Sequence, residues 1–198
     1  MAYLCDIEDL FALIGGTADP TDVRALLALE GASGVVRKFT GQTFDLVEDD
    51  DVTLDGRGTY DLVLPQLPVL SITTIETLDA EDVATDVTTY RYNAAGVVHR
   101  LDAVWPIGFG NIVVTYDHGY ILPGETGVTL PDEIRSTTAQ IAARLYSLSS
   151  AGGTVTSETI GSYSYTADAA ESASSSTVPG LTDTEALVLT RYRTPPIA

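Results

Sequence analysis

The chain has 198 residues, of which 44% are hydrophobic, so it can bury a core and is not disordered throughout. Its 28 acidic and 10 basic residues give a formal net charge of −18, which argues against a surface that wraps nucleic-acid phosphates with Lys and Arg. The single cysteine, Cys5, excludes an intrachain disulfide and a cysteine-based zinc site. No apolar run has transmembrane length and residues 1–11 do not resemble a secretory signal, so we expect a soluble protein without a membrane partner.

Two helices are predicted before residue 42. Apolar residues recur at helical spacing over residues 6–14, and two glycines then stop the helix. The second helix is predicted over residues 20–39, with Asp19 as its cap and Pro20 at its first position. Small residues at 31–34 in this helix either permit close approach of a neighbouring helix or produce a kink.

The pattern changes to short strands between residues 43 and 117. Pro65 and Pro68 precede one strand, and the β-branched and aromatic run 113–116 ends at a turn at Gly119. Short strands separated by glycine turns favour antiparallel pairing in a small barrel or curled sheet. Strands are expected at about 43–47, 51–54, 60–64, 70–78, 87–92, 97–101 and 111–117.

A third helix is predicted from Pro131 to about residue 149, with Thr129 as its cap. Its expected buried stripe is Ile134, Thr138, Ile141, Leu145 and Leu148.

The last helix, 182–192, begins at Thr182, whose capping-box partner is Glu185. Residues 155–165 alternate and predict a hairpin or an extended arm, whereas the Ser/Ala-rich residues 167–177 form a linker or become ordered on assembly.

The predicted fold class is therefore α+β, a helical core of about four helices with an inserted small antiparallel β-subdomain. The expected parts are N-terminal helices 1–42, the inserted β-subdomain 43–123, a core helix 124–153, an extended arm and Ser/Ala-rich segment 154–180, and a C-terminal helix and tail 181–198.

No group of residues predicts catalysis, and we expect no enzyme, no cofactor and no metal. His99 and His118 lack partners at metal-ligand spacing, although Asp117 could orient His118, which is expected in a turn. The acidic run 48–51 lacks the EF-hand spacing and is interpreted as a solvated turn. Cys5 is expected to be buried or inert.

The remaining features concern interaction. Tyr163 and Tyr165 are candidates for exposed aromatic contacts with a neighbour, or they fold back on the core. The full set of interaction candidates is Ile160, Tyr163, Tyr165, Tyr192 and Arg193.

Several of these motifs together resemble the head-to-tail connector, or adaptor, proteins of long-tailed phages. They are Leu64-Pro65, Pro68-Val69, Trp105-Pro106, the run Tyr116 to Tyr120, Pro131 opening a helix with Ala142 and Leu145, the run Glu158 to Tyr165, and Leu181 to Arg193.

The resemblance implies a structural virion protein of the capsid–tail neck, assembled in the host cytoplasm. It implies a ring of copies, expected to be twelve, that lies under the portal protein, extends the DNA channel and docks the next neck or tail protein. DNA would pass through the channel without specific binding.

Two alternatives stay open. One is another neck or tail-completion subunit. The other is a ligand-binding β module with Trp105, Tyr90 and Tyr120 as its platform, although these aromatic residues are more simply interpreted as core.

Overall fold

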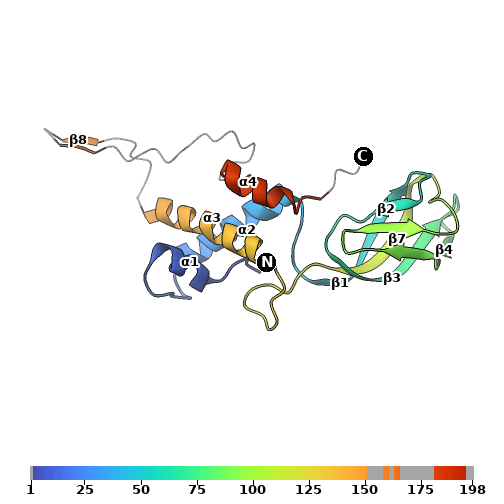
Figure 1. The fold of residues 1–198 in the computed structure, drawn as a ribbon, viewed down its shortest axis with the longest axis horizontal. Coiled ribbons are helices and arrows are strands. Elements are labelled where there is room, and N and C mark those ends of the chain that lie inside the picture. The colour runs from blue at the N-terminus through green and yellow to red at the C-terminus, as the bar shows by residue number, and fades with distance from the viewer. Residues whose placement is uncertain (1, 151–157, 161–162, 166–180, 195–198) are drawn as a thin grey trace. The chain divides into compact units, whose positions relative to one another are not determined.

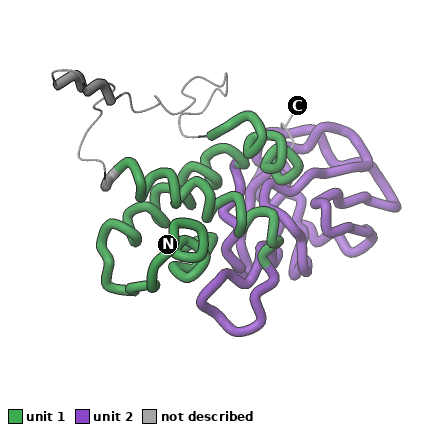
Figure 2. The backbone as a smooth tube through the Cα atoms, turned by 60° about the vertical axis from the view of Figure 1, so that its left-hand side comes forward, with its two compact units in different colours: residues 1–40, 130–193 green, residues 41–129, 194–198 purple. Residues whose placement is uncertain are grey.

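The computed structural model describes residues 2–150, 158–160, 163–165 and 181–194. The chain forms two compact units (Figure 2). The helical unit comprises Met1–Thr40 and Leu130–Arg193, and the β-unit comprises Gly41–Thr129 together with Thr194. The predicted α+β class, a helical part with a small antiparallel β region, is confirmed. No helix among the described residues is long and apolar enough to cross a bilayer.

Four helices build the helical unit (Figure 1): α1 (Ile7–Ile14), α2 (Val23–Thr40), α3 (Asp132–Ser150) and α4 (Asp183–Thr190). Helix α2 packs along α3, and a Cβ added at Gly31 would lie 3.2 Å from Cδ1 of Leu145. The small residue at Gly31 therefore permits the close approach of α3, which was one of the two interpretations. Gly34 faces open space, and α2 continues through both glycines without a break.

The predicted start and cap of the second helix are wrong, and so is the predicted cap of the third helix, which begins at Asp132 next to Pro131. Helix α2 begins at Val23, and its cap is Asp22, whose Oδ1 accepts from two backbone N–H groups of the first turn at 2.9 and 3.3 Å. Asp19 instead accepts a hydrogen bond from the backbone N–H of Thr21 at 2.8 Å, in the turn that precedes α2. Thr129 accepts from the backbone N–H of Ile121 at 2.9 Å and does not cap α3.

The buried stripe of α3 is shorter than predicted. Ile134, Thr138 and Ile141 are buried, whereas Leu145 is partly buried and Leu148 is 62% exposed. Helix α3 continues to Ser150, but among the described residues other elements cover this face only over the part that contains Ile134, Thr138 and Ile141.

The β-unit contains two antiparallel sheets. The four-stranded sheet has the order β1–β7–β3–β4, and the three-stranded sheet has the order β2–β6–β5. Their strands are β1 (Val47–Gly56), β2 (Asp61–Val63), β3 (Val69–Leu78), β4 (Ala84–Asp86), β5 (Tyr90–Tyr92), β6 (Val97–Arg100) and β7 (Gly108–His118).

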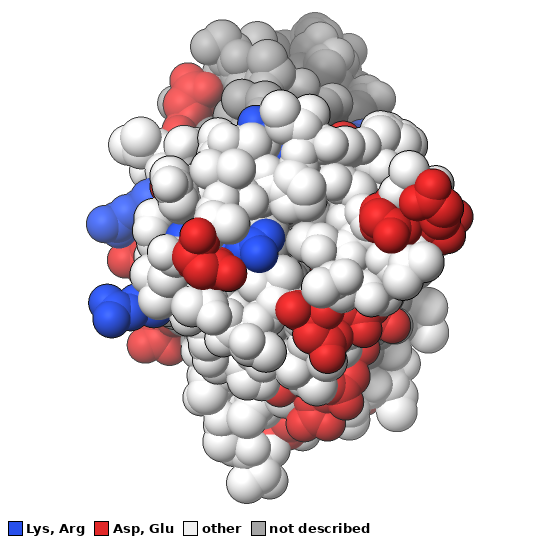
Figure 3. Space-filling model, turned by 90° about the vertical axis from the view of Figure 1, so that its right-hand side faces the viewer, with Lys and Arg blue, Asp and Glu red and all other residues white. Residues whose placement is uncertain are grey.

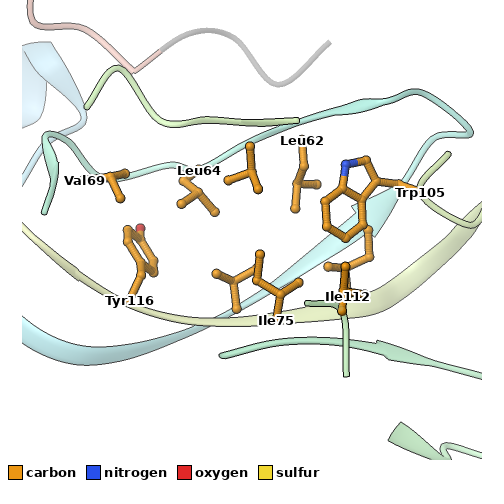
Figure 4. Packing of buried hydrophobic residues seen from close by; sticks show 10 residues of the cluster. Leu62, Leu64, Val69, Ile75, Trp105, Ile112 and Tyr116 are labelled. Carbon is orange, nitrogen blue, oxygen red and sulfur yellow. The ribbon is translucent and has the colours of Figure 1, made fainter. Parts of the chain in front are cut away.

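The core of the β-unit lies between these sheets. Leu62 of β2 faces Ile75 of β3 and Ile112 of β7, and the fully buried Trp105 closes one end (Figure 4). The indole N–H of Trp105 donates to the backbone oxygen of Tyr60 at 3.0 Å, which satisfies its polar atom inside the core.

The predicted strand at 43–47 is wrong in its extent. Only Asp45 in this segment forms an isolated parallel bridge, with Tyr120, and the next strand runs over Val47–Gly56. The acidic run 48–51 accordingly lies in a strand and not in a turn. Aspartate is depleted in strands in general, but here the hydroxyl groups of Thr73 on β3 and Thr115 on β7 bond two of the carboxylates.

A third, separate pair of strands confirms the predicted hairpin: β8 (Glu158–Ile160) pairs antiparallel with β9 (Tyr163–Tyr165). The Ser/Ala-rich segment 167–177 and the tail 195–198 lie outside the described residues.

Candidate interaction surfaces

Helix α4 is fixed to α3 by an ion pair. The guanidinium of Arg144 donates to both carboxylate oxygens of Glu185, at 2.6 and 2.8 Å, and Glu185 is only 5% exposed. The same carboxylate accepts from the backbone N–H of Thr182 at 2.9 Å, which confirms the predicted capping box. Burial raises the pKa of Glu185, but the bonds from Arg144 and Thr182 outweigh it and hold the pKa below its ordinary value.

A groove of about 610 Å³ opens between α3 and α4. Leu187, which is 74% exposed, and the partly buried Val188 supply its apolar part, and Gln140 and Thr184 are among its polar residues. The groove is also lined by three charged residues, and we define the α3–α4 groove as Leu187, Val188, Gln140 and Thr184 together with Glu133, Ser136, Thr137, Glu185 and Arg191.

Sequence reasoning missed this groove, although a signal was present. Leu187 and Leu189 are two residues apart, and because each residue turns a helix by about 100°, their side chains point to nearly opposite sides of α4. Leu189 is fully buried, and Leu187 is therefore left at the surface.

The two C-terminal interaction candidates have contacts within the helical unit. The hydroxyl of Tyr192 donates to Oε2 of Glu133 at 3.1 Å, and the guanidinium of Arg193 lies 5.3 Å from the centre of the Phe39 ring. These contacts hold the end of α4 against α2 and α3. Their role toward a partner stays a prediction.

The other three candidates lie on the β8–β9 hairpin. The register pairs Ile160 with Tyr163 and Glu158 with Tyr165, so the positions of all three candidates share one face of the ladder. Positions 159 and 164, which are Thr and Ser, share the other face. The register pairs Ile160 with Tyr163, and the role of these candidates toward a partner stays a prediction.

A second exposed apolar surface lies on the β-unit. Phe109 is 95% exposed and Ile107 is 83% exposed, on either side of Gly108. The segment is braced, because the side chain of Asn111 bonds the backbone of Gly56 and of Pro106 at 2.8 and 3.0 Å. Such large exposed residues are typical of a contact surface.

The acidic run of β1 is bonded within the sheet. Oδ1 of Asp49 accepts from the hydroxyl of Thr73 at 3.0 Å, and Oδ1 of Asp51 accepts from that of Thr115 at 2.6 Å. On the face that Figure 3 draws, acidic side chains form several separate groups and basic ones are few. Among the described residues no cluster of His, Cys, Asp and Glu has the arrangement of a metal site.

His118 is buried at the end of β7, only 2% exposed, and is not in a turn as predicted. Its Nε2 lies 3.1 Å from Oδ2 of Asp50, so Asp50 contacts this ring. Asp117, the expected partner, instead bonds the hydroxyl of Ser71 and the backbone N–H of Asp49, and these bonds lower its pKa. His99 is exposed and lies 2.6 Å from Asp61.

The aromatic residues suggested as a ligand platform do not form an exposed surface. Trp105 is fully buried, Tyr90 packs against the core, and Tyr120 stacks on Phe44 with ring centres 6.4 Å apart. Cys5 is also fully buried, and burial is the main reason that its pKa rises to about 12. The prediction of a buried thiol is confirmed.

The sequence matches the family described as head completion protein over residues 4–160, which is more than half of the chain. The chain belongs to the head completion protein family. This membership confirms the resemblance to head-to-tail connector proteins. No curated protein matches the chain.

Solved structures share the fold of this head completion protein. A chain from the neck of the empty gene transfer agent (GTA) particle, computed with C6 symmetry, has a TM-score of 0.54 and 18% identity, with 100% of this chain and 96% of that chain covered. A chain from the virion of the native GTA particle has a TM-score of 0.54 and 18% identity, with 96% of this chain and 89% of that chain covered. A chain from the neck of the native GTA particle, computed with C12 symmetry, has a TM-score of 0.50 and 17% identity, with 100% of this chain and 96% of that chain covered.

Proposed function

We propose that this head completion protein is a structural component of the virion neck, a head-to-tail connector that forms a ring under the portal. The family match over residues 4–160 carries the proposal. The fold shared with chains of GTA particles supports it over nearly the whole length of the chain. In this role the protein extends the DNA channel and docks the next neck or tail protein, after assembly in the host cytoplasm.

A ring requires a head-to-tail interface, in which two different surfaces of one copy meet and the rotation closes. The helical unit offers two such surfaces, the α3–α4 groove and the β8–β9 hairpin. We propose twelve copies. The C12 symmetry used for the native GTA neck and the C6 symmetry used for the empty one both agree with this number.

The charge of the protein fits a channel through which DNA slides. A net charge of −18 repels phosphates, and a lumen lined by carboxylates would not bind DNA as a basic surface does. Exposed acids such as Glu48 and Asp51 on β1 are candidates for this lining. If the lining is correct, replacing them with Ala should slow DNA packaging or ejection, and unaltered packaging and ejection would contradict it.

Native mass spectrometry of the purified protein, alone and with its cognate portal, tests the proposal. We expect a closed ring of copies bound to the portal. A protein that stays monomeric and does not bind the portal would contradict the connector role.

A second candidate is another neck position, filled when the head is completed. The family description, head completion protein, names the completion of the head and does not name the portal. Particles arrested at successive stages distinguish the two. A connector is present in heads that lack every other neck protein, whereas a later subunit is absent from them.

A further inference from the structure

Strand β1 is a long strand at the edge of its sheet. The two sheets of the β-unit have four edge strands, and β2, β4 and β5 have three residues each, whereas β1 has ten. Among the described residues, β7 is the only strand that pairs with β1. Alternate residues of an antiparallel strand direct their N–H and C=O groups away from the partner strand. One side of β1 therefore presents backbone groups that a further strand can bond.

The middle of β1 keeps a regular strand geometry. The register with β7 shifts near both ends of the strand, between Val47 and Asp50 and between Leu54 and Gly56. The five residues from Asp50 to Leu54 pair with β7 without a shift. A bulge protects an edge by twisting it away from other strands, but these shifts leave the middle of β1 unprotected. This stretch has the geometry that strand addition by a partner requires.

The two faces of β1 determine which side chains a further strand must carry. Val52 and Leu54 pack against the core of the β-unit and are only partly buried, so the core is open along this edge. Asp51 and Thr53 alternate with them and are exposed on the other face. A strand that extends the sheet therefore needs apolar side chains beside Val52 and Leu54, and side chains that suit a carboxylate beside Asp51.

The charge of the sheet selects the occupant of this edge. The four strands β1, β7, β3 and β4 contain eight acidic residues and no Lys or Arg. A second copy of β1 would place acidic residues beside acidic residues, and like charges on neighbouring strands destabilise their pairing. Lys or Arg beside Asp51 would instead form a pair of opposite charge. The acidic residues thus exclude a copy of the same strand and favour a basic one.

We propose that the edge of β1 binds an extended basic segment of another protein, which adds to the sheet as a further strand. In this segment Lys or Arg alternates with apolar residues, so that one face contacts the open core and the other contacts Asp51. The carboxylate of Asp51 is already held, because its Oδ1 accepts from the hydroxyl of Thr115 at 2.6 Å, and less side-chain freedom is lost on binding. This inference goes beyond the proposed function and does not require a ring.

Binding of a synthetic peptide to the full chain tests the proposal. The probe is a capped peptide of about seven residues, within the usual length of a strand, in which Lys and Val alternate. The control peptide has the same residues with every Lys at one end, so its charge is equal but its two faces do not differ. We expect the alternating peptide to bind at least about tenfold more tightly. Equal affinity of the two peptides would overturn the proposal.

A pair of matched variants tests the role of Asp51. Asp51→Lys should weaken binding of the alternating peptide at least about tenfold, because an attractive pair becomes repulsive. Glu76→Lys changes the net charge by the same amount on β3, which has a strand on each side, and should weaken binding less than about threefold. Equal weakening by both variants would show that only the overall charge attracts the peptide, and would overturn the proposal.

Amide hydrogen exchange of the unchanged protein locates the contact without any variant. The outward N–H groups between Asp50 and Leu54 should exchange quickly in the free protein and at least about tenfold more slowly with the peptide. The amides of β4, at the opposite edge of the same sheet, should not change. Protection elsewhere than at β1 would overturn the proposal. So would slow exchange of β1 in the free protein, which would show a second copy at this edge if it depends on concentration, and the same chain if it does not.

Backbone methylation distinguishes strand addition from a contact made by side chains alone. Methylating the backbone nitrogen of every Lys, or of every Val, blocks the N–H groups along one edge of the peptide only. One of the two methylated peptides should lose binding and the other should retain it. Equal binding by both would contradict strand addition.

These outcomes are separate from the test of the connector role. A ring on the portal without peptide binding overturns this inference alone, whereas peptide binding without a ring leaves the inference standing and contradicts the connector. Peptide binding would also assign Asp51 to a protein contact, and the lining of the channel would then consist of other exposed acids such as Glu48.

Discussion

Removing the carboxylate of Glu185 should destabilise the helical unit by about 2 kcal/mol. Hydrogen bonds to charged groups contribute about 1.5–3 kcal/mol when buried, and the capping-box bond to Thr182 adds about 0.5–1 kcal/mol. The side chain of Arg144 is 39% exposed, so water partly replaces its lost partner, and the lower end of the range applies. Alanine also restores a few tenths of a kcal/mol through its helix propensity.

Urea unfolding followed by two signals measures this effect. All four helices of the described residues belong to the helical unit, so far-ultraviolet circular dichroism mainly follows that unit. Trp105 is the only tryptophan of the chain and lies in the β-unit, so its fluorescence follows the other unit. For Glu185→Ala we expect the dichroism midpoint to fall by about 1 M urea, and the fluorescence midpoint to change less.

Glu185→Gln is the graded control, because glutamine can still accept the capping bond but carries no charge. It should lower stability by about 1 kcal/mol, between the unchanged protein and the alanine variant. A dichroism midpoint that does not move in Glu185→Ala would refute the reasoning. It would mean that the ion pair contributes nothing beyond what water supplies to the separated groups.

Three further predictions concern pH, a glycine and the thiol. The pKa of Glu185 is lowered from its ordinary value of 4.5 in the folded protein. The stabilisation from its carboxylate is therefore present above about pH 4.5 and is lost as the pH falls through the lowered pKa. The stability of Glu185→Gln should not show this loss on acidification. A Cβ at Gly119 would lie 2.0 Å from the backbone oxygen of Asp45 at φ +95°, so Gly119→Ala should lower the free energy of unfolding that Trp105 fluorescence measures by at least about 2 kcal/mol. Gly124 has a similar φ of +92° but faces open space, so Gly124→Ala should lower it by about 1 kcal/mol, and equal losses would contradict the clash. Cys5 should react with a thiol reagent only after unfolding, since it is fully buried and its pKa is about 12, and rapid labelling of the native protein would contradict this burial.

Local patterns in the sequence were sufficient to predict a helix cap or a strand start where one residue type favours one backbone conformation. The capping box of Thr182 and Glu185 and the strand that begins after Pro68 follow from backbone chemistry within a few residues. The hairpin at 158–165 follows from alternation on either side of a short connection. For the same reason the α+β class could be predicted from the change in period after residue 42.

Features that depend on neighbours distant in sequence could not be predicted. Asp19 and Asp22 are chemically equivalent caps, but only Asp22 also accepts a hydrogen bond from the hydroxyl of Tyr146 on α3, at 2.9 Å. The aspartates of β1 are strand residues because β1 pairs with β7, which is distant in sequence, and Thr73 and Thr115 donate hydroxyl groups to two of them.

In the α3–α4 groove, Arg144 of α3 bonds Glu185 of α4, and on the same helix Leu189 is buried whereas Leu187 is exposed. The sequence by itself determined which segments form helices and strands, since these depend on periodicity and on caps within one turn. Only the tertiary structure decided which side of each segment remains available to a partner, because that depends on the residues that cover the opposite side.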